Sequence, residues 1–520
     1  MPAPEVRIGL DVGGTNTDAV ALDSNDVLLA KAKVTTTADV TGGIRAALAS
    51  VLADLGPERS RVTHVMLGTT HATNAILERR GLDRVVLIRI GGPATHAIRP
   101  LFAWPQDLRE AVSAGELIVE GGSEFDGREI MPLDLETVRR FLGGLGAGVD
   151  GVAIASVFAP VSAEHELRVG ELVRAQLGDS VNVSLSHEIG TVGLLERENA
   201  TVLNAALVGV ARTVAGALAA ALEEHGLRPQ TFFAQNDGTL MALDFVLHHP
   251  VLTIGSGPAN SIRGAAYLTG AGDAIVADVG GTSTDIGVLA NGFPRESTTP
   301  AEIGGVRTNF RMPDLVAIAL GGGSVVHDRD GVVAVGPDSV GHRLTERALV
   351  FGGDVATLTD AACAAGRARV GDPTIVAAQR ATFEPALEAA DAILADAIDR
   401  VKLVRGAQPL VVVGGGSVLV PDELPGVSEV QRPEHFDVAN AIGAAIASVS
   451  GQVDRIFHPG SGGRQAAIDE ACDEARRQAE RAGASPGQTE IVEVEEIPLA
   501  YLTNPASRIR VKAVGPLGAF

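Results

Sequence analysis

Asp11-Val12-Gly13-Gly14-Thr15-Asn16-Thr17-Asp18 recurs later in the chain as Asp278-Val279-Gly280-Gly281-Thr282-Ser283-Thr284-Asp285, and seven of the eight positions are identical. An apolar run precedes each octad, and a second apolar run that ends in a turn signal follows it. This pattern predicts a strand, a glycine-rich turn and a second strand for each octad. The spacing is too long for a solenoid repeat, and it indicates two duplicated domains that face each other.

The octad has the composition of a phosphate-binding turn. Because glycine lacks a Cβ, a Gly-Gly turn lets the backbone approach a bulky anion, and its consecutive N–H groups can form an anion-binding nest. The aspartates would repel phosphate, so their expected role is to hold hydrated Mg²⁺ or to orient a water molecule. Turn formation alone would account for the glycines but not for the Thr-x-Thr-Asp that follows them in both octads.

Other nucleotide-binding signatures are absent from the sequence. It contains no GxxxxGK[ST] motif of a P-loop and no GxGxxG between a strand and a helix. Lysine occurs at only four positions, none of them near an octad in the sequence: Lys31, Lys33, Lys402 and Lys512. The charge of a bound phosphate is therefore expected to be neutralised by Mg²⁺ and by backbone N–H groups, with arginine as an additional candidate.

The composition excludes several classes of protein. The chain of 520 residues has a formal net charge of −22, and 46 % of its residues are hydrophobic. A disordered chain would contain fewer aliphatic residues, and a general nucleic-acid binder needs an excess of Lys and Arg. Two cysteines are too few for a disulfide framework, so a reducing cytoplasm is the expected location. No signal peptide is visible, and no membrane-spanning helix is expected because polar residues interrupt the two most apolar stretches, Gly151–Ala163 and Val202–Leu222.

Strands alternate with helices along the chain, which predicts an α/β fold. Residues 91–132 are rich in Gly, Pro and charge and are expected to form an insertion or a loop-rich subdomain. A long helix is predicted over Glu198–Gly226 and an amphipathic one over Gln465–Ala482, where Ile468, Cys472, Ala475 and Ala479 share a face. Two further glycine-rich turns, Gly321–Ser324 and Gly414–Ser417, are weak signals by themselves, although the second would suit a flat adenine resting on bare backbone.

The two octads and the Gly414–Ser417 turn resemble the two phosphate motifs and the adenosine motif of the actin, heat-shock chaperone and sugar kinase superfamily. A longer ordered set of motifs, over roughly residues 5–450, resembles the hydantoinase A / 5-oxoprolinase family. That set comprises Ile8–Thr15, Gly68–Ala75, Ser184–Glu188, Glu196–Asn199 with Thr201–Ala205, Ser256–Ala259, Asp278–Asp285, Gly321–Ser324, Gly336–Ser339 and Thr357–Ala361.

The resemblance implies two duplicated actin-like (ribonuclease H-like) ATPase lobes around a nucleotide cleft, followed by a small C-terminal α+β appendage. The expected boundaries are 1–190 for the first lobe, with the inserted segment near 91–132, 191–455 for the second lobe and 456–520 for the appendage. The C-terminal region is expected to be shorter than in many members of the family.

Carried over residue by residue, the resemblance assigns ATP and Mg²⁺ to the two turns. Asp11 and Asp278 are expected to hold Mg²⁺ through water and to be catalytic, with Asp18 and Asp285 as the next candidates. The other implied contacts are Gly13, Gly14, Thr15 and Asn16 in the first phosphate loop; Gly280, Gly281, Thr282, Ser283 and Thr284 in the second; Gly415, Gly416 and Ser417 at adenosine; and Thr69, Thr70, His71 and Asn74 at the substrate.

The resemblance also implies a reaction, in which ATP phosphorylates the carbonyl oxygen of a cyclic amide (a hydantoin, 5-oxoproline or a lactam). Nitrogen resonance makes such a carbonyl a poor electrophile, and phosphorylation of its oxygen breaks that resonance. A hydantoinase B-type partner subunit then completes the ring opening. A small-molecule kinase, a carboxylase beta-type subunit of the same superfamily and a non-enzymatic ATP-binding scaffold stay open as alternatives. An oligomer is expected, without nucleic-acid or membrane partners.

Two histidine sites are interpreted conservatively. His187 and Glu188 follow an expected strand, and a satisfied polar loop is the preferred reading over a catalytic pair. His248 and His249 precede a proline. A metal site is not expected there, because the sequence offers no third ligand at a suitable spacing.

Overall fold

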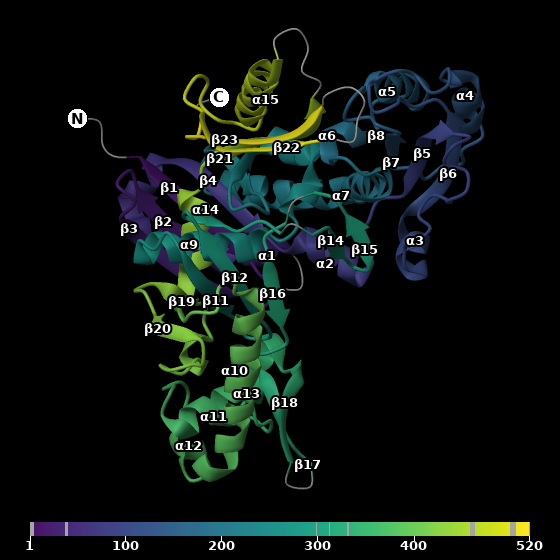
Figure 1. Cartoon of the computed structure of the whole chain (residues 1–520). Helices are drawn as coiled ribbons and strands as arrows, with labels where there is room; N and C mark the ends of the chain where they lie inside the picture. Colours follow the sequence, from purple (N-terminus) through teal and green to yellow (C-terminus); the bar gives the residue numbers. More distant parts are fainter. Residues whose placement is uncertain are drawn as a thin grey trace.

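The computed structural model describes residues 5–36, 40–297, 299–310, 312–329, 332–457, 463–499 and 506–518. Strands and helices alternate as predicted, and three large sheets organise the molecule (Figure 1). Two of these sheets each contain one octad hairpin, and the third forms a separate block at the side (Figure 1).

The largest sheet has nine strands in the order β22-β23-β21-β10-β9-β4-β1-β2-β3. Helices α1, α7 and α15 contribute to the main hydrophobic core of this sheet, and α14 packs on β1 and β2 through a smaller cluster. The strands are β1 (Val6–Val12), β2 (Asn16–Asp23), β3 (Leu28–Thr35), β4 (Val62–Thr69), β9 (Gln230–Ala234), β10 (Leu240–Ala242), β21 (Val449–Phe457), β22 (Glu490–Pro498) and β23 (Ser507–Gly515); the helices are α1 (Val40–Leu55), α7 (Leu194–Glu224), α14 (Ala439–Ile446) and α15 (Gly463–Arg481).

The side block is a parallel four-stranded sheet in the order β6-β5-β7-β8. Helices α4 and α5 cover one face and α7 covers the other, so α7 is shared between this sheet and the largest one. The elements are β5 (Val85–Gly92), α3 (Gln106–Val112), β6 (Ser113–Glu120), α4 (Leu135–Gly143), β7 (Gly151–Ser156), α5 (Glu164–Leu177), β8 (Asn182–Leu185) and α6 (Ser186–Ile189).

The second octad lies in a six-stranded sheet in the order β13-β12-β11-β19-β20, with β16 also paired to β12. Helices α11 and α13 cover one face and α9 covers the other, and this lobe extends away from the largest sheet (Figure 1). The elements are α9 (Ser256–Thr269), β11 (Ala274–Val279), β12 (Thr284–Ala290), β13 (Phe293–Pro294), β16 (Leu315–Ile318), α11 (Leu358–Ala365), α13 (Arg380–Val401), β19 (Gln408–Val413) and β20 (Val427–Gln431).

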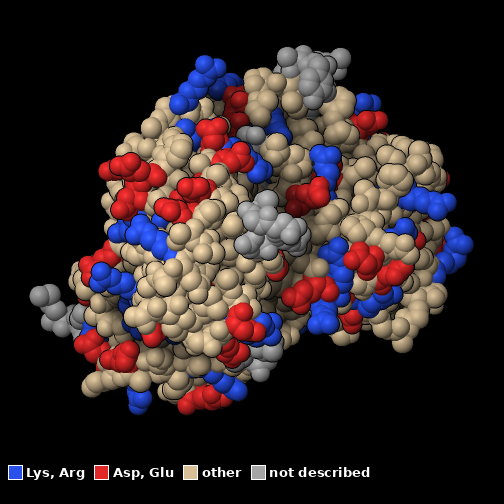
Figure 2. All heavy atoms as spheres, turned by 90° about the horizontal axis from the view of Figure 1, so that it is seen from below, with Lys and Arg blue, Asp and Glu red and all other residues tan. Residues whose placement is uncertain are grey.

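The remaining named elements are short. They are α2 (His71–Glu78), α8 (Leu243–His248), α10 (Leu344–Arg347), α12 (Thr374–Ala377) and the hairpins β14 (Ala301–Ile303) with β15 (Val306–Thr308) and β17 (Ser324–Arg329) with β18 (Val332–Ser339). Figure 2 shows the molecule from below, where the visible acidic and basic side chains are interspersed.

The sheets divide the chain differently from the predicted boundaries. Strands β9 and β10, placed in the second lobe by the boundary at 191, pair into the first sheet. Residues 456–520 extend the first sheet, because β21 crosses that boundary and pairs with β10, and β23 and β22 continue the sheet. The segment 91–132 is rich in turns and loops, and it also contributes α3 and the edge strand β6 to the side block.

Helix α7 is, among the described helices, long and apolar enough to cross a membrane by length and composition alone. In the fold, 61 % of its most apolar window is buried inside the protein, where it packs on α1 and β7. Its apolar surface is therefore used largely for internal packing.

Candidate nucleotide and substrate site

Both octads form the predicted antiparallel hairpins, and their turns close in the same way. Asp11 pairs with Asp18 across β1 and β2, and Asp278 pairs with Asp285 across β11 and β12. The Gly13 N–H donates to the Asn16 carbonyl at 3.0 Å, and the Gly280 N–H donates to the Ser283 carbonyl at 2.9 Å. The sequence repeat is thus a structural repeat down to the hydrogen bond that closes each turn.

The two turns face each other. A Cβ on Gly281 would lie 3.6 Å from Cγ2 of Thr15 in the other turn, whereas a Cβ on Gly14 would meet no atom within 4 Å. Gly14, Thr282 and Ser283 are exposed. None of the four turn glycines has a positive φ, so glycine serves here to leave backbone N–H groups uncovered rather than to permit an unusual conformation.

Asp11 is buried at 4 % exposure and is held by amides from two helices. Asn260 on α9 donates to Asp11 Oδ1 at 3.4 Å, and Asn440 on α14 donates to Asp11 Oδ2 at 3.0 Å and to Asp18 Oδ2 at 2.9 Å. Burial, together with the charge of Asp18, raises the pKa of Asp11 to about 7. Burial also raises the pKa of Asp18, although Lys33 opposes this rise.

The second octad has the corresponding carboxylates. Ser261, the residue after Asn260 on α9, donates to Asp278 Oδ2 at 2.5 Å, so one helix contacts the first aspartate of both octads. Burial raises the pKa of Asp278, and burial together with Asp278 raises the pKa of Asp285 to about 7. Asp11 and Asp285, the two carboxyl groups with pKa values near neutrality, would accept a divalent cation, since the charge of the cation favours their ionised forms.

Helices α9 and α14 connect the two lobes by very close packing. A Cβ on Gly264 of α9 would overlap the Ala439 carbonyl oxygen of α14, and a Cβ on Gly443 of α14 would overlap the Asn260 carbonyl oxygen. This close approach of the two backbones positions both Asn260 and Asn440 over Asp11.

A lysine does lie at the site, contrary to the expectation from the sequence. Lys33 on β3 is opposite Asp18 on β2, and its Nζ donates to Asp18 Oδ1 at 2.7 Å. It also donates to the Asp437 carbonyl at 3.0 Å. The hairpin signal at Ser24-Asn25-Asp26 could have revealed this contact, because continuing the β2–β3 pairing outward from that turn brings Lys33 opposite Asp18.

The Gly414–Ser417 turn lies directly against the second octad. Gly414 has a φ of 85°, and a Cβ on it would overlap Asp278 Oδ1, so only glycine fits this position. The Gly416 N–H donates to the Val279 carbonyl at 2.7 Å. Gly415 is exposed and available to a ligand, whereas Gly416 and Ser417 are buried, and the Ser417 hydroxyl has no hydrogen-bond partner in the described part of the chain.

The Gly321–Ser324 turn and the predicted contact Thr284 support the second turn from behind. The N–H groups of Gly322 and Gly323 donate to the carbonyls of Gly280 and Gly281 at 3.0 and 2.7 Å. Thr284 is buried, and its hydroxyl donates to the Leu320 carbonyl at 2.6 Å. Thr284 therefore holds the turn in place instead of offering its hydroxyl to a ligand.

The residues predicted for the substrate lie beside the first octad. Thr69 ends β4, where it pairs with Val12, and the Thr70 N–H donates to the Val12 carbonyl at 3.2 Å. Thr69 Oγ1 is 2.6 Å from His71 Nδ1, and burial lowers the pKa of His71. Asn74, one turn further along α2, approaches the Thr70 hydroxyl at 3.5 Å.

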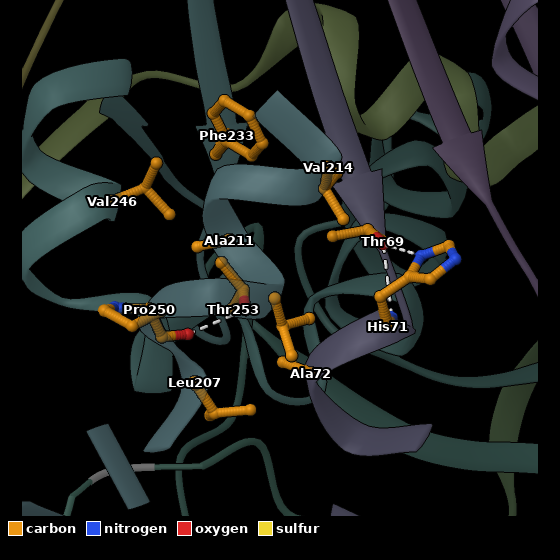
Figure 3. Close-up of a pocket in the computed structure, with 11 residues that line it drawn as sticks. Thr69, His71, Ala72, Leu207, Ala211, Val214, Phe233, Val246, Pro250 and Thr253 are labelled. Atoms are coloured by element: carbon orange, nitrogen blue, oxygen red, sulfur yellow. Dashed lines mark hydrogen bonds between the residues drawn. The ribbon is translucent and has the colours of Figure 1, made fainter. Parts of the chain in front are cut away.

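Thr69 and His71 also line a cavity of about 20 Å³. Its other walls are almost entirely apolar, and Figure 3 shows the imidazole of His71 lying away from them, on the far side of Thr69. The other lining residues are Ala72, Leu207, Val210, Ala211, Val214, Phe233, Val246, Pro250 and Thr253.

His187 and His249, which the sequence also singled out, make structural contacts. His187 Nδ1 lies 2.6 Å from the fully buried Glu166 carboxylate, which also accepts from the Ser186 hydroxyl at 2.5 Å, and Glu188 is exposed. His249 stacks on Phe245. Within the described ranges, no three His, Cys, Asp or Glu side chains converge on a common metal position.

Comparisons with known proteins indicate the family. One family model, hydantoinase/oxoprolinase N-terminal region, matches residues 7–177, and a second, hydantoinase/oxoprolinase, matches residues 197–374. Caprolactamase subunit alpha of Pseudomonas jessenii is 30 % identical over 394 residues, which cover 70 % of this chain and 55 % of that protein.

Two further curated relatives differ in their named activity. Acetophenone carboxylase gamma subunit of Aromatoleum aromaticum is 27 % identical over 388 residues, which cover 68 % of this chain and 52 % of that protein. The 5-oxoprolinase of Saccharomyces cerevisiae is 28 % identical over 419 residues, which cover 71 % of this chain and 32 % of that protein. The chain thus spans about half the length of the first two relatives and a third of the last.

Two solved structures have the same fold. The ATP-dependent caprolactamase of Pseudomonas jessenii superposes with a TM-score of 0.76 at 21 % identity, over 98 % of this chain and 88 % of that one. Nucleotide-free acetone carboxylase superposes with a TM-score of 0.71 at 17 % identity, over 99 % and 88 % of the two chains. This likeness confirms the predicted fold class.

Proposed function

The chain belongs to the hydantoinase/oxoprolinase family, and we propose that it is the ATP-hydrolysing subunit of an enzyme that opens a cyclic amide. The observation that carries this proposal is the meeting of the two octad turns, with Thr15 of one against Gly281 of the other. A polyphosphate between the turns would receive backbone N–H groups from both lobes, and the exposed Gly415 lies where adenosine would follow. Relatives named caprolactamase and 5-oxoprolinase support a cyclic amide as the substrate.

The carboxylates fit a hydrated Mg²⁺. Asp11 and Asp278 offer the hard oxygen ligands that this ion prefers, and Mg²⁺ usually retains several waters. Both are already hydrogen-bonded, to Asn260, Asn440 and Ser261, which suits contact through water rather than direct ligation. When bound, Mg²⁺ would neutralise charge on the transferring phosphate.

The substrate would lie next to the first turn. The region of Thr69, Thr70 and His71 borders the first octad, so a carbonyl oxygen placed there would face the terminal phosphate. The carbonyl oxygen attacks the γ-phosphorus and ADP leaves, which gives an O-phosphorylated amide. Addition of water at the carbonyl carbon and cleavage of the C–N bond, with the proton going to nitrogen, then open the ring and leave an acyl phosphate. A second water hydrolyses this acyl phosphate to the carboxylate and inorganic phosphate. His71, whose pKa burial lowers, is neutral at pH 7 and can donate a hydrogen bond without adding charge.

A ketone is the second candidate substrate. Acetophenone carboxylase gamma subunit is a relative at 27 % identity, and acetone carboxylase has the same fold. The same two turns would then phosphorylate a ketone or its co-substrate ahead of carboxylation. The two candidates share the nucleotide site and differ only in what occupies the region of Thr69 and His71.

The proposed enzyme is a complex. Relatives are named as subunits of caprolactamase and of carboxylases, and we infer that a B-type subunit completes the reaction of this chain in the cytoplasm. In this proposal the phosphorylated amide passes to that partner, as the naming of the relatives as subunits suggests.

The experiment is a coupled assay with the B-type subunit supplied. Phosphate release from Mg·ATP is measured with and without a hydantoin, 5-oxoproline, a simple lactam and a ketone with bicarbonate. We expect one cyclic amide to raise ATP turnover, with ring opening in proportion. Asp11→Ala and Asp278→Ala should each abolish it, whereas Asp273→Ala, which removes an exposed carboxylate near the second octad, should not.

Three other outcomes would contradict the proposal, and each would favour a different function. Turnover raised only by the ketone would favour the carboxylase. A stable phosphorylated product formed by this chain alone would indicate a small-molecule kinase. ATP binding with turnover unaffected by every compound would indicate a scaffold.

A further inference from the structure

Lys33 occupies an unusual position among the charges of the site. The site gathers four aspartates, two from each octad, and in the described ranges Lys33 is the single cation that forms an ion pair with any of them. Its charge acts on both octads, because it lowers the pKa of Asp18 and also that of Asp278 against the effect of burial.

The surroundings of Lys33 come from three elements. Asp18 is on β2, and the Asp437 carbonyl belongs to a short helix, Phe436–Val438, in the segment before α14. The Lys33 side chain also passes the adenosine turn, since a Cβ on Gly415 would lie 3.9 Å from its Cε. The Lys33 side chain thus extends from Asp18 of the first octad to the exposed glycine of the adenosine turn.

The Lys33 ammonium group uses two of its three N–H donors in the described part of the chain. A lysine carries three N–H donors and no acceptor. Two of them are used, on Asp18 Oδ1 at 2.7 Å and on the Asp437 carbonyl at 3.0 Å, while 32 % of the side chain stays exposed. The two fixed contacts orient the third donor without consuming it.

We propose that Lys33 is the phosphate-binding lysine of this chain: its third N–H donates to the phosphate groups nearest the adenosine turn, while Asp18 and Asp437 hold it in place. The ligand class is a nucleoside di- or triphosphate, and the inference rests on the proposed function only for the identity of the nucleotide. Lys33 then does what the lysine of a P-loop does, but from a neighbouring strand instead of from the turn itself.

Lys31 provides a matched control. It lies two residues earlier on β3 and pairs with the Asp437 carboxylate at 2.9 Å, so it links the same two segments. It forms no ion pair with an octad aspartate in the described part of the chain. Lys31→Gln therefore removes the same charge and a comparable link without removing the proposed donor.

The experiment compares Lys33→Gln, Lys33→Arg and Lys31→Gln with the full chain by calorimetric titration, using Mg·ADP and adenosine as probes. We expect Lys33→Gln to weaken Mg·ADP binding by about 10- to 100-fold, the range of a charge-assisted hydrogen bond, and adenosine binding by less than about twofold. Lys33→Arg should recover much of the loss, and Lys31→Gln should leave both affinities within about twofold. A thermal melt of each variant monitors folding.

Three results would overturn the inference: unchanged Mg·ADP binding in Lys33→Gln, equal losses for ADP and adenosine, which would indicate a distorted turn, or equal losses in Lys31→Gln. Absence of Mg·ADP binding by the wild-type chain would overturn it as well. Failure of every cyclic amide to stimulate turnover, with the predicted binding pattern intact, would refute only the proposed function.

Discussion

Replacing Asn440 with alanine should shift the pH dependence of ATP turnover. One amide group donates both of its protons, to Asp11 at 3.0 Å and to Asp18 at 2.9 Å, and each bond favours the ionised carboxylate. A hydrogen bond to a charged group contributes about 1.5–3 kcal/mol, and one pKa unit corresponds to about 1.4 kcal/mol. Asn440→Ala should therefore raise the pKa of Asp11, already about 7, by about 1–2 units.

The assay is kcat/KM for Mg·ATP across the pH range, because this ratio reports the ionisation of the free enzyme. Since Asp11 must be ionised to hold hydrated Mg²⁺, activity falls as pH drops through its folded-state pKa. In Asn440→Ala that acidic limb should lie at higher pH, with activity at pH 7 reduced about 5- to 50-fold and partly recovered at pH 9.

Asn199→Ala is the matched control for this prediction. Asn199 is also nearly buried and also makes two hydrogen bonds, with Trp104 and with the Arg307 carbonyl, but neither partner belongs to an octad. It should lower stability and leave the acidic limb in place. A limb in Asn440→Ala that coincides with that of the wild type, or moves to lower pH, would refute the reasoning.

Three further predictions concern stability and substrate binding. The pKa of Asp285 is raised from 3.8 to about 7, so its contribution to the free energy of unfolding is full below pH 4 and is lost as pH rises through 7. Asp285→Asn should abolish this part of the pH dependence and, in urea unfolding at pH 8, raise the free energy of unfolding by about 1–3 kcal/mol. An unchanged pH profile of stability would contradict the assignment. Gly264→Ala should cost about 1–3 kcal/mol or more by the same measurement because its Cβ would overlap the Ala439 carbonyl, and Gly272→Ala, which meets no atom within 4 Å, should stay within about 0.5 kcal/mol. His71→Ala should raise KM for the cyclic amide several-fold at unchanged KM for ATP; equal changes in both would argue against a substrate role for His71.

The octad hairpins could be predicted from the sequence because every feature that forms them is local. Apolar strands, a Gly-Gly turn and a following Thr-x-Thr-Asp occur within a few residues, and the structure reproduces even the turn-closing bond in both copies. The resemblance to a known family then supplied the fold and the cleft, which no local pattern encodes.

The groups that hold the aspartates could not be predicted. Asn260, Ser261 and Asn440 are polar residues within helices, and nothing in their neighbourhood indicates that two helices bring them to Asp11 and Asp278. The pairing of β10 with β21 could not be predicted either, since it joins segments far apart in the chain.

Helix α15 shows how a correct pattern can miss the packing. The predicted face contained Ile468, Cys472, Ala475 and Ala479. The fully buried row is Ala467, Ala471, Ala475 and Ala479, and Ile468 and Cys472 are only partly buried beside it. The reason is Gly451 on β21, where a Cβ would overlap the backbone of Ala479. Only small side chains allow this close approach, and hydrophobicity alone does not reveal it.

The most direct test of the central claim is a calorimetric titration of the chain with Mg·ADP, repeated on Asp11→Asn and Asp278→Asn. The two octads form one site in this account, so the wild type should bind one nucleotide per chain, and each variant should lose most of the Mg²⁺-dependent part of the affinity. Two nucleotides per chain, or a variant of either octad that binds Mg·ADP as the wild type does, would contradict it.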